Sequence, residues 1–205
     1  MSAKADYYVG CDFISHQTIA SLPPYQTMKP IFLMGFMGCG KSAVARSLSS
    51  QLRMPFIDLD ARIERQIGCS IASFFAERGE AEFRALETKH LAQVAIRRGV
   101  ISLGGGVPMR QENRDLLQDA IDGGAMVVYL QTSAPVLAKR IRRSPGKRPL
   151  IDGDGELSLE DTQRRVEELL AGREEVYLEC ASFVVSTDDD TIPDIAHHIA
   201  RAHTD

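Results

Sequence analysis

A glycine-rich segment that ends in a lysine and a serine carries the clearest chemical signal in this sequence. Gly35 is followed by four residues and then by Gly40, Lys41 and Ser42, which is the spacing of a phosphate-binding loop. Backbone N–H groups at the start of a helix form a site for a polyphosphate, and glycines let the chain approach it closely. Lys41 is placed to reach the outer phosphates, and the Ser42 hydroxyl can bind the Mg²⁺ ion that bridges them. The segment therefore predicts binding of a nucleoside triphosphate.

The residues on either side of this loop fit that interpretation. Residues 31–34 form an apolar run typical of a buried strand, and apolar residues recur at helical spacing from Val44 to Leu52. A phosphate loop requires a strand before it and a helix after it. The alternative is a glycine-rich turn that ends in Lys-Ser by coincidence.

Two aspartates follow the second apolar run, in Phe56-Ile-Asp-Leu-Asp60. Because acids alternate with apolar residues there, Asp58 and Asp60 are predicted to project from one side of a strand end. One carboxylate could serve the metal and the other an acceptor hydroxyl. A helix cap at the boundary between Leu59 and Asp60 is the alternative, and it would account for one of the two acids.

Two separated arginines suggest an acceptor that carries a carboxylate, because a guanidinium group binds a carboxylate through two parallel hydrogen bonds. Arg84 lies three residues before Glu87 on a predicted helix, so a surface ion pair between them is the alternative. Arg173 is expected near the end of a later helix that continues to Cys180. The triple glycine 104–106 then leaves bare backbone for the close approach of a small ligand.

Short apolar runs alternate with longer amphipathic segments from Lys29 onward. This alternation is typical of a parallel sheet with helices on both faces, so we expect a three-layer, doubly wound α/β fold with five parallel strands. In such sheets ligands gather at the carboxyl ends of the strands, where the loop, the aspartates and the glycines would meet. A capping box at 158–161 predicts one helix start, and the last helix is expected to begin near 191–193. The predicted strands are 31–34, 56–59, 100–103, 126–130 and 183–185.

Two segments interrupt this alternation. Residues from about 60 to 98 contain two helical stretches, broken near Gly68 and Gly79, with no strand between them, and are predicted to form a substrate-binding insertion over one end of the sheet. Residues from about 138 to 155 are rich in lysine and arginine and end in a flexible Asp/Gly stretch, which is typical of a lid that closes over phosphates. The alternative for the second segment is a solvated basic helix end, which the helix dipole favours.

The composition bounds the kind of protein. With 205 residues, 44% of them hydrophobic and 25% charged, the chain is an ordinary globular protein of one core, so we expect residues 30–205 to form a single domain. Residues 1–29 show no sustained periodicity and are predicted to be an N-terminal extension. Disorder, packing on a partner subunit and an artificial addition are open alternatives for it.

Charge and hydropathy exclude several kinds of partner. A net charge of −4 gives no reason to expect nucleic acid, and no apolar run approaches the ~18 residues of a membrane span. We therefore expect a cytoplasmic monomer that acts on small molecules. The four cysteines are scattered and suggest neither a zinc site nor disulfides. Cys39 has two interpretations. Its thiol could have a lowered pKa among the N–H groups at the helix start and react unusually fast, or it could be a small residue that fills a position in the loop.

Between about Ile31 and Asp188 the sequence resembles the shikimate kinases. The phosphate loop is shared with many kinases, but the Asp-Leu-Asp, Phe-Arg and triple-glycine set is much narrower. The resemblance implies transfer of the γ-phosphate of ATP, with Mg²⁺, to the 3-hydroxyl of shikimate in chorismate and aromatic amino-acid biosynthesis. The motifs that carry it, in the family's order, are residues 35–42, 56–60, 68–71, 79–80 with Phe83, Arg84 and Glu87, 104–106, 148–150, and Arg173 with Tyr177, Glu179 and Ala181.

The resemblance also implies a role for each matching residue. The catalytic residues would be Lys41, Asp60 and Arg148. ATP would contact Gly38, Cys39, Gly40, Lys41, Ser42, Ala43, Arg140, Arg148 and Thr187. Shikimate would contact Asp60, Arg84, Gly105, Gly106 and Arg173, and Mg²⁺ would bind Ser42 and Asp58. Cys39, Ala43 and Ile151 depart from the family's usual residues, which affects fine nucleotide contacts, since no charged functional group is lost.

Two other functions are compatible with the same motifs. A kinase of another small hydroxy acid, such as gluconate, would also bind a carboxylate and hydroxyls. A regulatory paralogue that binds nucleotide without catalysis would keep the phosphate loop, although this chain also retains the charged residues of the acceptor site.

Overall fold

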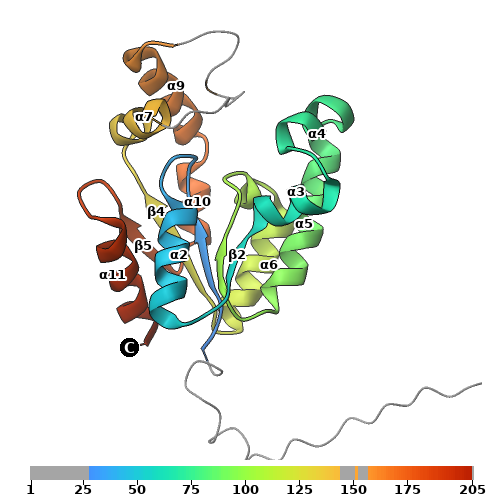
Figure 1. Ribbon diagram of the computed structural model, residues 1–205, viewed down its shortest axis with the longest axis vertical. Helices are drawn as coiled ribbons and strands as arrows, with labels where there is room; N and C mark the ends of the chain where they lie inside the picture. The colour runs from blue at the N-terminus through green and yellow to red at the C-terminus, as the bar shows by residue number, and fades with distance from the viewer. Residues whose placement is uncertain (1–27, 144–150, 152–156, 205) are drawn as a thin grey trace, which may run out of the picture.

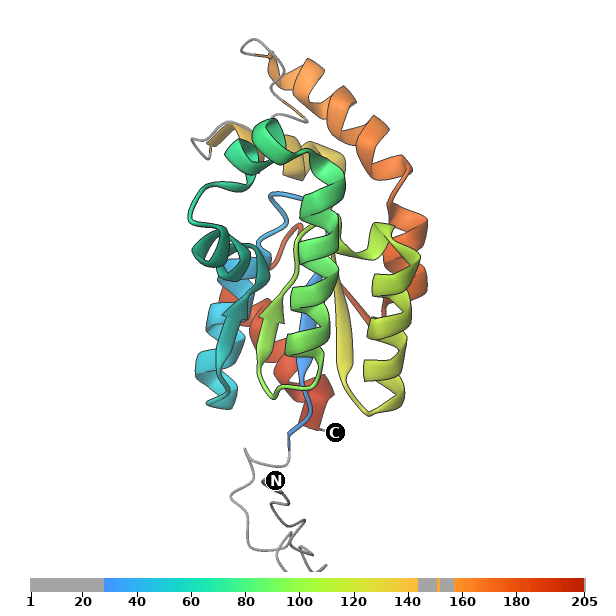
Figure 2. The same cartoon turned by 90° about the vertical axis from the view of Figure 1, so that its right-hand side faces the viewer.

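The computed structural model describes residues 28–143, 151 and 157–204, which form a five-stranded parallel sheet with helices on both faces (Figure 1, Figure 2). The strand order is β2-β3-β1-β4-β5, so β1 is central and β2 and β5 are the edges. The predicted doubly wound α/β fold is confirmed, and each predicted strand end agrees to within one residue. The strands are β1 (Ile31–Met34), β2 (Phe56–Asp58), β3 (Val100–Ser102), β4 (Met126–Gln131) and β5 (Phe183–Ser186).

The central strand β1 is continuously apolar because helices cover both of its faces. All four of its side chains are fully buried. Helices α2 (Lys41–Leu52) and α11 (Ile192–Thr204) lie side by side on one face of the sheet, and α5 (Glu80–Ala95) and α6 (Gln111–Asp122) cover the other (Figure 1, Figure 2). Leu33 is in register with Ser102 of β3 and Val128 of β4, so the loops that follow these strands begin next to one another.

The insertion between β2 and β3 contains three helices, whereas the sequence predicted two. They are α3 (Leu59–Ile67), α4 (Ile71–Arg78) and α5. Gly68 and Gly79 end α3 and α4 as predicted, with φ angles of 76° and 83°. The helix α4 forms because Ser70 caps it, accepting a hydrogen bond from the Ser73 N–H. It stands beyond the carboxyl ends of the strands (Figure 1).

A second group of helices rises at the same end of the sheet, on the other side. It comprises α7 (Ala134–Arg143), α9 (Leu159–Ala171) and α10 (Glu174–Cys180) (Figure 1). Ser158 caps α9 by accepting from the Asp161 N–H, which confirms the predicted helix start. Residues 138–143 of the predicted lid belong to α7, and residues 144–150, with Arg148, lie outside the described residues.

The described apolar residues form one connected core that spans the sheet and the helices on both of its faces. A short 3-10 turn, η2 (Val107–Met109), follows the triple glycine. None of the described helices combines the length and apolar character needed to cross a membrane. The predicted N-terminal extension lies outside the described residues up to residue 27.

Candidate active site

The phosphate loop joins β1 to the N-terminus of α2. Gly38 and Gly40 have φ angles of 85° and 100°, which residues with side chains rarely adopt. A Cβ atom on Gly35 would lie 2.8 Å from the carbonyl oxygen of Leu130, so the loop packs directly against β4. No described side chain caps the N-terminus of α2, and its first N–H groups are therefore available to phosphate oxygens.

Lys41 folds back over the loop that precedes it. Its Nζ atom donates to the carbonyl oxygens of Gly35 and Phe36, each at 2.9 Å, and lies 3.8 Å from the Cys39 sulfur. The Cys39 side chain is 1% exposed. This burial favours the interpretation of Cys39 as a residue that fills the loop.

A cluster of hard oxygen atoms lies beside the start of α2. Ser42 Oγ donates to Asp58 Oδ2 at 2.7 Å and lies 3.3 Å from Ser102 Oγ. Such ligands suit Mg²⁺, which usually keeps waters and phosphate oxygens in its remaining positions. Among the described residues no group of three or more His, Cys, Asp and Glu is placed to hold a metal alone. The residues present therefore fit a Mg²⁺ ion that binds together with a nucleotide.

The two aspartates do not project from one strand, and that prediction was wrong. The strand β2 ends at Asp58, and Asp60 lies in the first turn of α3. The helix starts early because Asp58 Oδ1 accepts a hydrogen bond from the Ala61 N–H at 3.1 Å. Asp58 thus uses one oxygen to cap α3 and the other to hold Ser42.

Asp60 faces the triple glycine that follows β3. A Cβ atom on Gly104 would lie 2.7 Å from Asp60 Oδ1. Burial raises the pKa of the Asp60 carboxyl, and the nearby charge of Lys41 offsets only part of that effect. A carboxylate with a raised pKa in a cleft is suited to accept a proton from a substrate.

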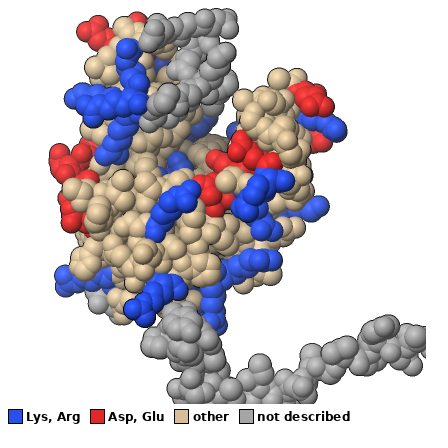
Figure 3. Space-filling view, viewed as in Figure 1, with Lys and Arg blue, Asp and Glu red and all other residues tan. Residues whose placement is uncertain are grey.

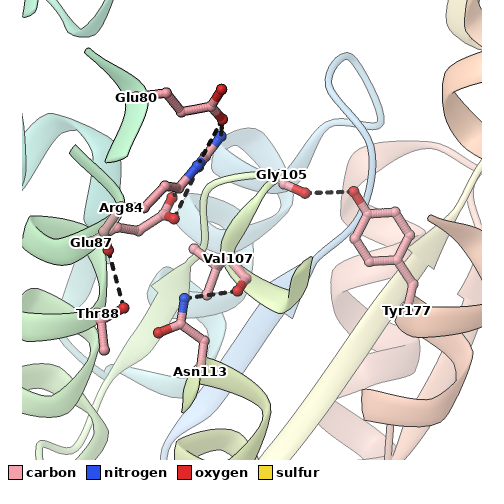
Figure 4. Close-up of polar contacts among 8 residues, drawn as sticks. All are labelled: Glu80, Arg84, Glu87, Thr88, Gly105, Val107, Asn113 and Tyr177. Carbon is pink, nitrogen blue, oxygen red and sulfur yellow. Dashed lines mark hydrogen bonds and ion pairs between the residues drawn. The ribbon is translucent and has the colours of Figure 1, made fainter. Parts of the chain in front are cut away.

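Arg84 is held by two glutamates of α5. Its Nη1 donates to both Glu87 oxygens, at 2.9 and 3.1 Å, and its Nη2 donates to Glu80 Oε1 at 2.8 Å (Figure 4). Glu87 is 1% exposed, so this is a largely buried pair rather than the surface ion pair considered as the alternative. Burial raises the pKa of Glu87 despite the opposing charge of Arg84. Burial lowers the pKa of Arg84, but the two glutamates outweigh it and the net change is a rise, so Arg84 stays charged.

The triple glycine makes room for the charged side chains around it. A Cβ atom on Gly106 would lie 2.5 Å from Arg84 Nη1, and one on Gly104 would lie 2.9 Å from Glu87 Oε1. On Gly105 it would lie 3.4 Å from the carbonyl oxygen of Gly35. The glycines therefore allow protein atoms to approach closely, and these belong to the acceptor-site side chains and the phosphate loop. The predicted approach of a small ligand stays a prediction.

Arg173 lies between two helices, whereas the sequence predicted one continuous helix. The helix α9 ends before Gly172, and Arg173 is the N-cap residue of α10. Its Cζ atom lies 5.8 Å from the centre of the Phe36 ring, next to the phosphate loop. One turn later, the Tyr177 hydroxyl donates to the Gly105 carbonyl oxygen at 2.6 Å (Figure 4).

Arg140 and Thr187, both predicted to lie near the nucleotide, are in contact. Arg140 Nη1 donates to Thr187 Oγ1 at 3.0 Å and to the Cys39 carbonyl oxygen at 3.4 Å, and Nη2 donates to the Thr187 carbonyl oxygen at 2.5 Å. Thr187 is fully buried, and its hydroxyl lies 2.7 Å from that of Thr132. This contact joins α7 and the end of β5 to the phosphate loop.

The phosphate loop, Asp60, Ser102 and Gly105 border a hollow at the carboxyl ends of the strands, and Arg84 and Arg173 are not among its lining residues. Its volume is about 390 Å³. In the space-filling view the surface is notched between the α7 and α9 side and the α4 side (Figure 3). The residues that line the hollow are Met37, Gly38, Gly40, Lys41, Ser42, Ala43, Asp60, Ser102, Leu103 and Gly105.

Three contributors to this site were missed or undervalued in the sequence. Ser102 ends β3 beside Ser42, Glu87 is buried against Arg84, and Tyr177 reaches the glycine loop. The four-residue spacing between Arg173 and Tyr177 is a helical signal that could have placed them together. No local signal reveals the contact of Tyr177 with Gly105, which lies 72 residues away.

A phosphate loop after the central strand of a parallel sheet, beside a carboxylate and a half-buried arginine, defines a P-loop kinase for a small molecule. Residues 37–204 match the family model described as shikimate kinase. The chain belongs to the shikimate kinase family.

Relatives and solved structures agree with this assignment. A shikimate kinase from Chlorobium chlorochromatii (strain CaD3) is 42% identical over 174 residues, which cover 83% of this chain and 88% of the relative. A shikimate kinase from Acinetobacter baumannii, solved in complex with shikimate, is 31% identical with a TM-score of 0.77, over 87% of this chain and 94% of that one. A shikimate kinase from Bacteroides thetaiotaomicron is 30% identical with a TM-score of 0.75, over 85% of this chain and 98% of that one.

Proposed function

We propose that this protein transfers the γ-phosphate of ATP to the 3-hydroxyl of shikimate, giving shikimate 3-phosphate in the synthesis of chorismate and aromatic amino acids. One observation carries the proposal. The side chains of Asp60 and Arg84 lie against Gly104 and Gly106, and Gly105 between them lies next to the phosphate loop. An acceptor with hydroxyls and a carboxylate would therefore lie directly beside the phosphate to be transferred.

The nucleotide side of the reaction rests on the start of α2. The N–H groups of residues 38–43 hold the phosphates, with Cys39 and Ala43 contributing backbone rather than charge. Lys41 leaves its two carbonyl partners and turns to the outer phosphates. Ser42 and Asp58 would hold Mg²⁺, which neutralises charge on the phosphate oxygens when bound.

The acceptor side rests on three charged groups. Asp60 accepts a hydrogen bond from the reacting hydroxyl and takes its proton, a role that its raised pKa supports. Arg84 and Arg173 bind the carboxylate, and the buried partner Glu87 fixes the direction of Arg84. Gly105 and Gly106 allow the ring of the acceptor to approach the backbone.

The remaining assignments are predictions from the family motifs. Arg148 would close on the phosphates from the lid, and Arg140 and Thr187 would border the adenine. The contact of Arg140 with the Cys39 carbonyl supports a position next to the phosphate loop for this pair. A cytoplasmic location and a monomeric state of the protein also stay predictions.

A coupled assay of ADP release tests the proposed reaction against both alternatives. The purified protein is incubated with ATP and Mg²⁺, and then with shikimate or gluconate. We expect turnover with shikimate and none above background with gluconate. Turnover with gluconate alone would identify a different hydroxy-acid kinase. Binding of ATP without release of ADP in either arm would identify a regulatory paralogue.

A further inference from the structure

The hydroxyl of Tyr177 lies at the junction of two parts of the acceptor site. Tyr177 is fully buried on α10, one turn after Arg173. Its hydroxyl donates to the Gly105 carbonyl oxygen at 2.6 Å, a short hydrogen bond between a helix and the loop that follows β3 (Figure 4). The family motifs include this tyrosine, but none of the roles derived above uses it.

The charge of Arg173 also acts on this hydroxyl. Burial raises the pKa of Tyr177 to about 12, and the nearby Arg173 guanidinium group offsets only part of this, so the hydroxyl remains a donor at neutral pH.

The hydrophobic core fixes where this hydroxyl lies. The Tyr177 ring stacks on the ring of Tyr129 from β4, with 5.2 Å between the ring centres and an angle of 28° between the planes. Both rings are at most 1% exposed. The Tyr177 N–H also donates to the Arg173 carbonyl oxygen at 3.0 Å. The tyrosine oxygen is therefore a rigid point against which the glycine loop is held.

The glycine loop connects this point to the other arginine. In Figure 4, Tyr177 and Arg84 lie on opposite sides of the loop. Gly105 bonds to Tyr177, and the next residue, Gly106, lies against the Arg84 guanidinium group. The position of Gly105 therefore affects the distance between the two groups expected to bind one carboxylate.

We propose that Tyr177 is a positioning residue for acceptor binding, whose hydroxyl bond to Gly105 fixes the glycine loop and thereby the position of Gly106 beside Arg84. The inference rests on the proposed function, because it assumes that Arg173 and Arg84 bind the acceptor carboxylate. It assigns Tyr177 an effect on the affinity for the acceptor and none on the affinity for the nucleotide. Loss of the hydroxyl from a tyrosine that only filled the core would not lower the affinity for the acceptor while leaving the affinity for the nucleotide unchanged.

Tyr177→Phe tests the inference, because it removes the hydroxyl and keeps the stacked ring. We expect the KM for shikimate to rise by about tenfold, because the glycine loop loses its hydrogen bond to α10, with the KM for ATP unchanged within about twofold. Tyr129→Phe is the matched control, since it removes a hydroxyl from the neighbouring ring, and its KM for shikimate should stay within about twofold of the wild type. A thermal melt of each variant reports whether the fold is retained.

A combined variant separates positioning from a general structural effect. If Tyr177 acts through the glycine loop on Arg84, then Tyr177→Phe should lower kcat/KM for shikimate by less than about twofold in an Arg84→Ala, Glu87→Gln background. The inference would be overturned by a full tenfold loss of kcat/KM in that background. It would also be overturned if the KM for shikimate did not change in Tyr177→Phe, or if Tyr129→Phe raised it equally. Wild-type protein inactive on shikimate would overturn the proposed function and this inference with it. Active wild type with an unaffected Tyr177→Phe variant would overturn the inference alone.

Discussion

Asp60 illustrates the conflict between stability and chemistry in this site. Its carboxylate must be ionised to take a proton, yet burial disfavours the ionised form and raises its pKa. Arg84 has no such conflict, because Glu87 and Glu80 offset its burial and keep it charged. The residues that carry the proposed reaction therefore differ in what they contribute to folding.

Replacing Asp60 with asparagine should remove the base and keep the shape. We expect kcat to fall by at least about 100-fold, the usual contribution of a general base, while the affinity for ATP stays within about twofold. Steady-state kinetics and a nucleotide titration measure the two effects. Equal losses of turnover and nucleotide binding would mean that Asp60 has a structural role instead.

The same substitution should stabilise the protein at neutral pH. Because the pKa of Asp60 is raised in the folded state, its contribution to stability is greatest at low pH and is lost as the pH rises through that pKa. Asparagine has no charge to bury, so Asp60→Asn should raise Tm at pH 8 by about 2–4 °C, equivalent to ~1 kcal/mol in a chain of this length. The advantage should shrink as the pH is lowered. A lower Tm than wild type at pH 8 would show that the charge is stabilising.

Arg84→Ala should damage both acceptor binding and stability. We expect shikimate affinity to fall by ~2–5 kcal/mol, because a desolvated carboxylate loses its partner. The fold should also lose about 3–5 kcal/mol, because the buried Glu87 is left unpaired. Adding Glu87→Gln to this variant should recover most of the stability and none of the affinity. Recovery of the affinity would place the carboxylate elsewhere.

The start of α3 shows how one residue can serve an element and a site together. Asp58 ends β2, caps α3 and holds Ser42, and this cap moves Asp60 from the predicted strand into the helix. The apolar run that precedes it was enough to predict the strand. The sequence did not decide between an extended strand and an early helix, because alternating acids fit both.

Asp58→Asn and Asp58→Ala separate the two roles of this residue. Asparagine caps helices about as well as aspartate, so the first variant should keep its stability within about 0.5 kcal/mol, whereas alanine should cost ~1 kcal/mol. Both should raise the Mg²⁺ concentration needed for half-maximal activity by about tenfold or more, because both remove the carboxylate charge. An unchanged Mg²⁺ requirement in both variants would exclude Asp58 from the metal site.

The loop that contains the triple glycine offers a second test, at a residue that carries no charge itself. Gly106 has φ −94° and ψ −8°, which alanine adopts without strain, but the added Cβ would lie 2.5 Å from Arg84 Nη1. Gly106→Ala should therefore displace the Arg84 guanidinium group and raise the KM for shikimate by about tenfold or more, leaving the KM for ATP within about twofold. An unchanged KM for shikimate would mean that Arg84 can move without loss of function.

The overall architecture was the most predictable part of this protein. Buried parallel strands are continuous apolar runs, so the sheet could be located from local sequence, and the phosphate loop fixed which strand precedes the nucleotide. The contacts that assemble the acceptor site join residues far apart in the chain, such as Tyr177 with Gly105. Periodicity does not report such contacts, and only the packing of α10 and the α3–α5 insertion around the glycine loop brings them together.

In the proposed reaction, Asp60, Arg84 and Arg173 bind one acceptor around the glycine loop. A crystal structure with ADP, Mg²⁺ and shikimate bound measures this directly. We expect the shikimate carboxylate within hydrogen-bond distance of both Arg84 and Arg173, with the 3-hydroxyl at Asp60 and facing the phosphates. A carboxylate bound away from both arginines, or a 3-hydroxyl that points away from the nucleotide, would contradict it.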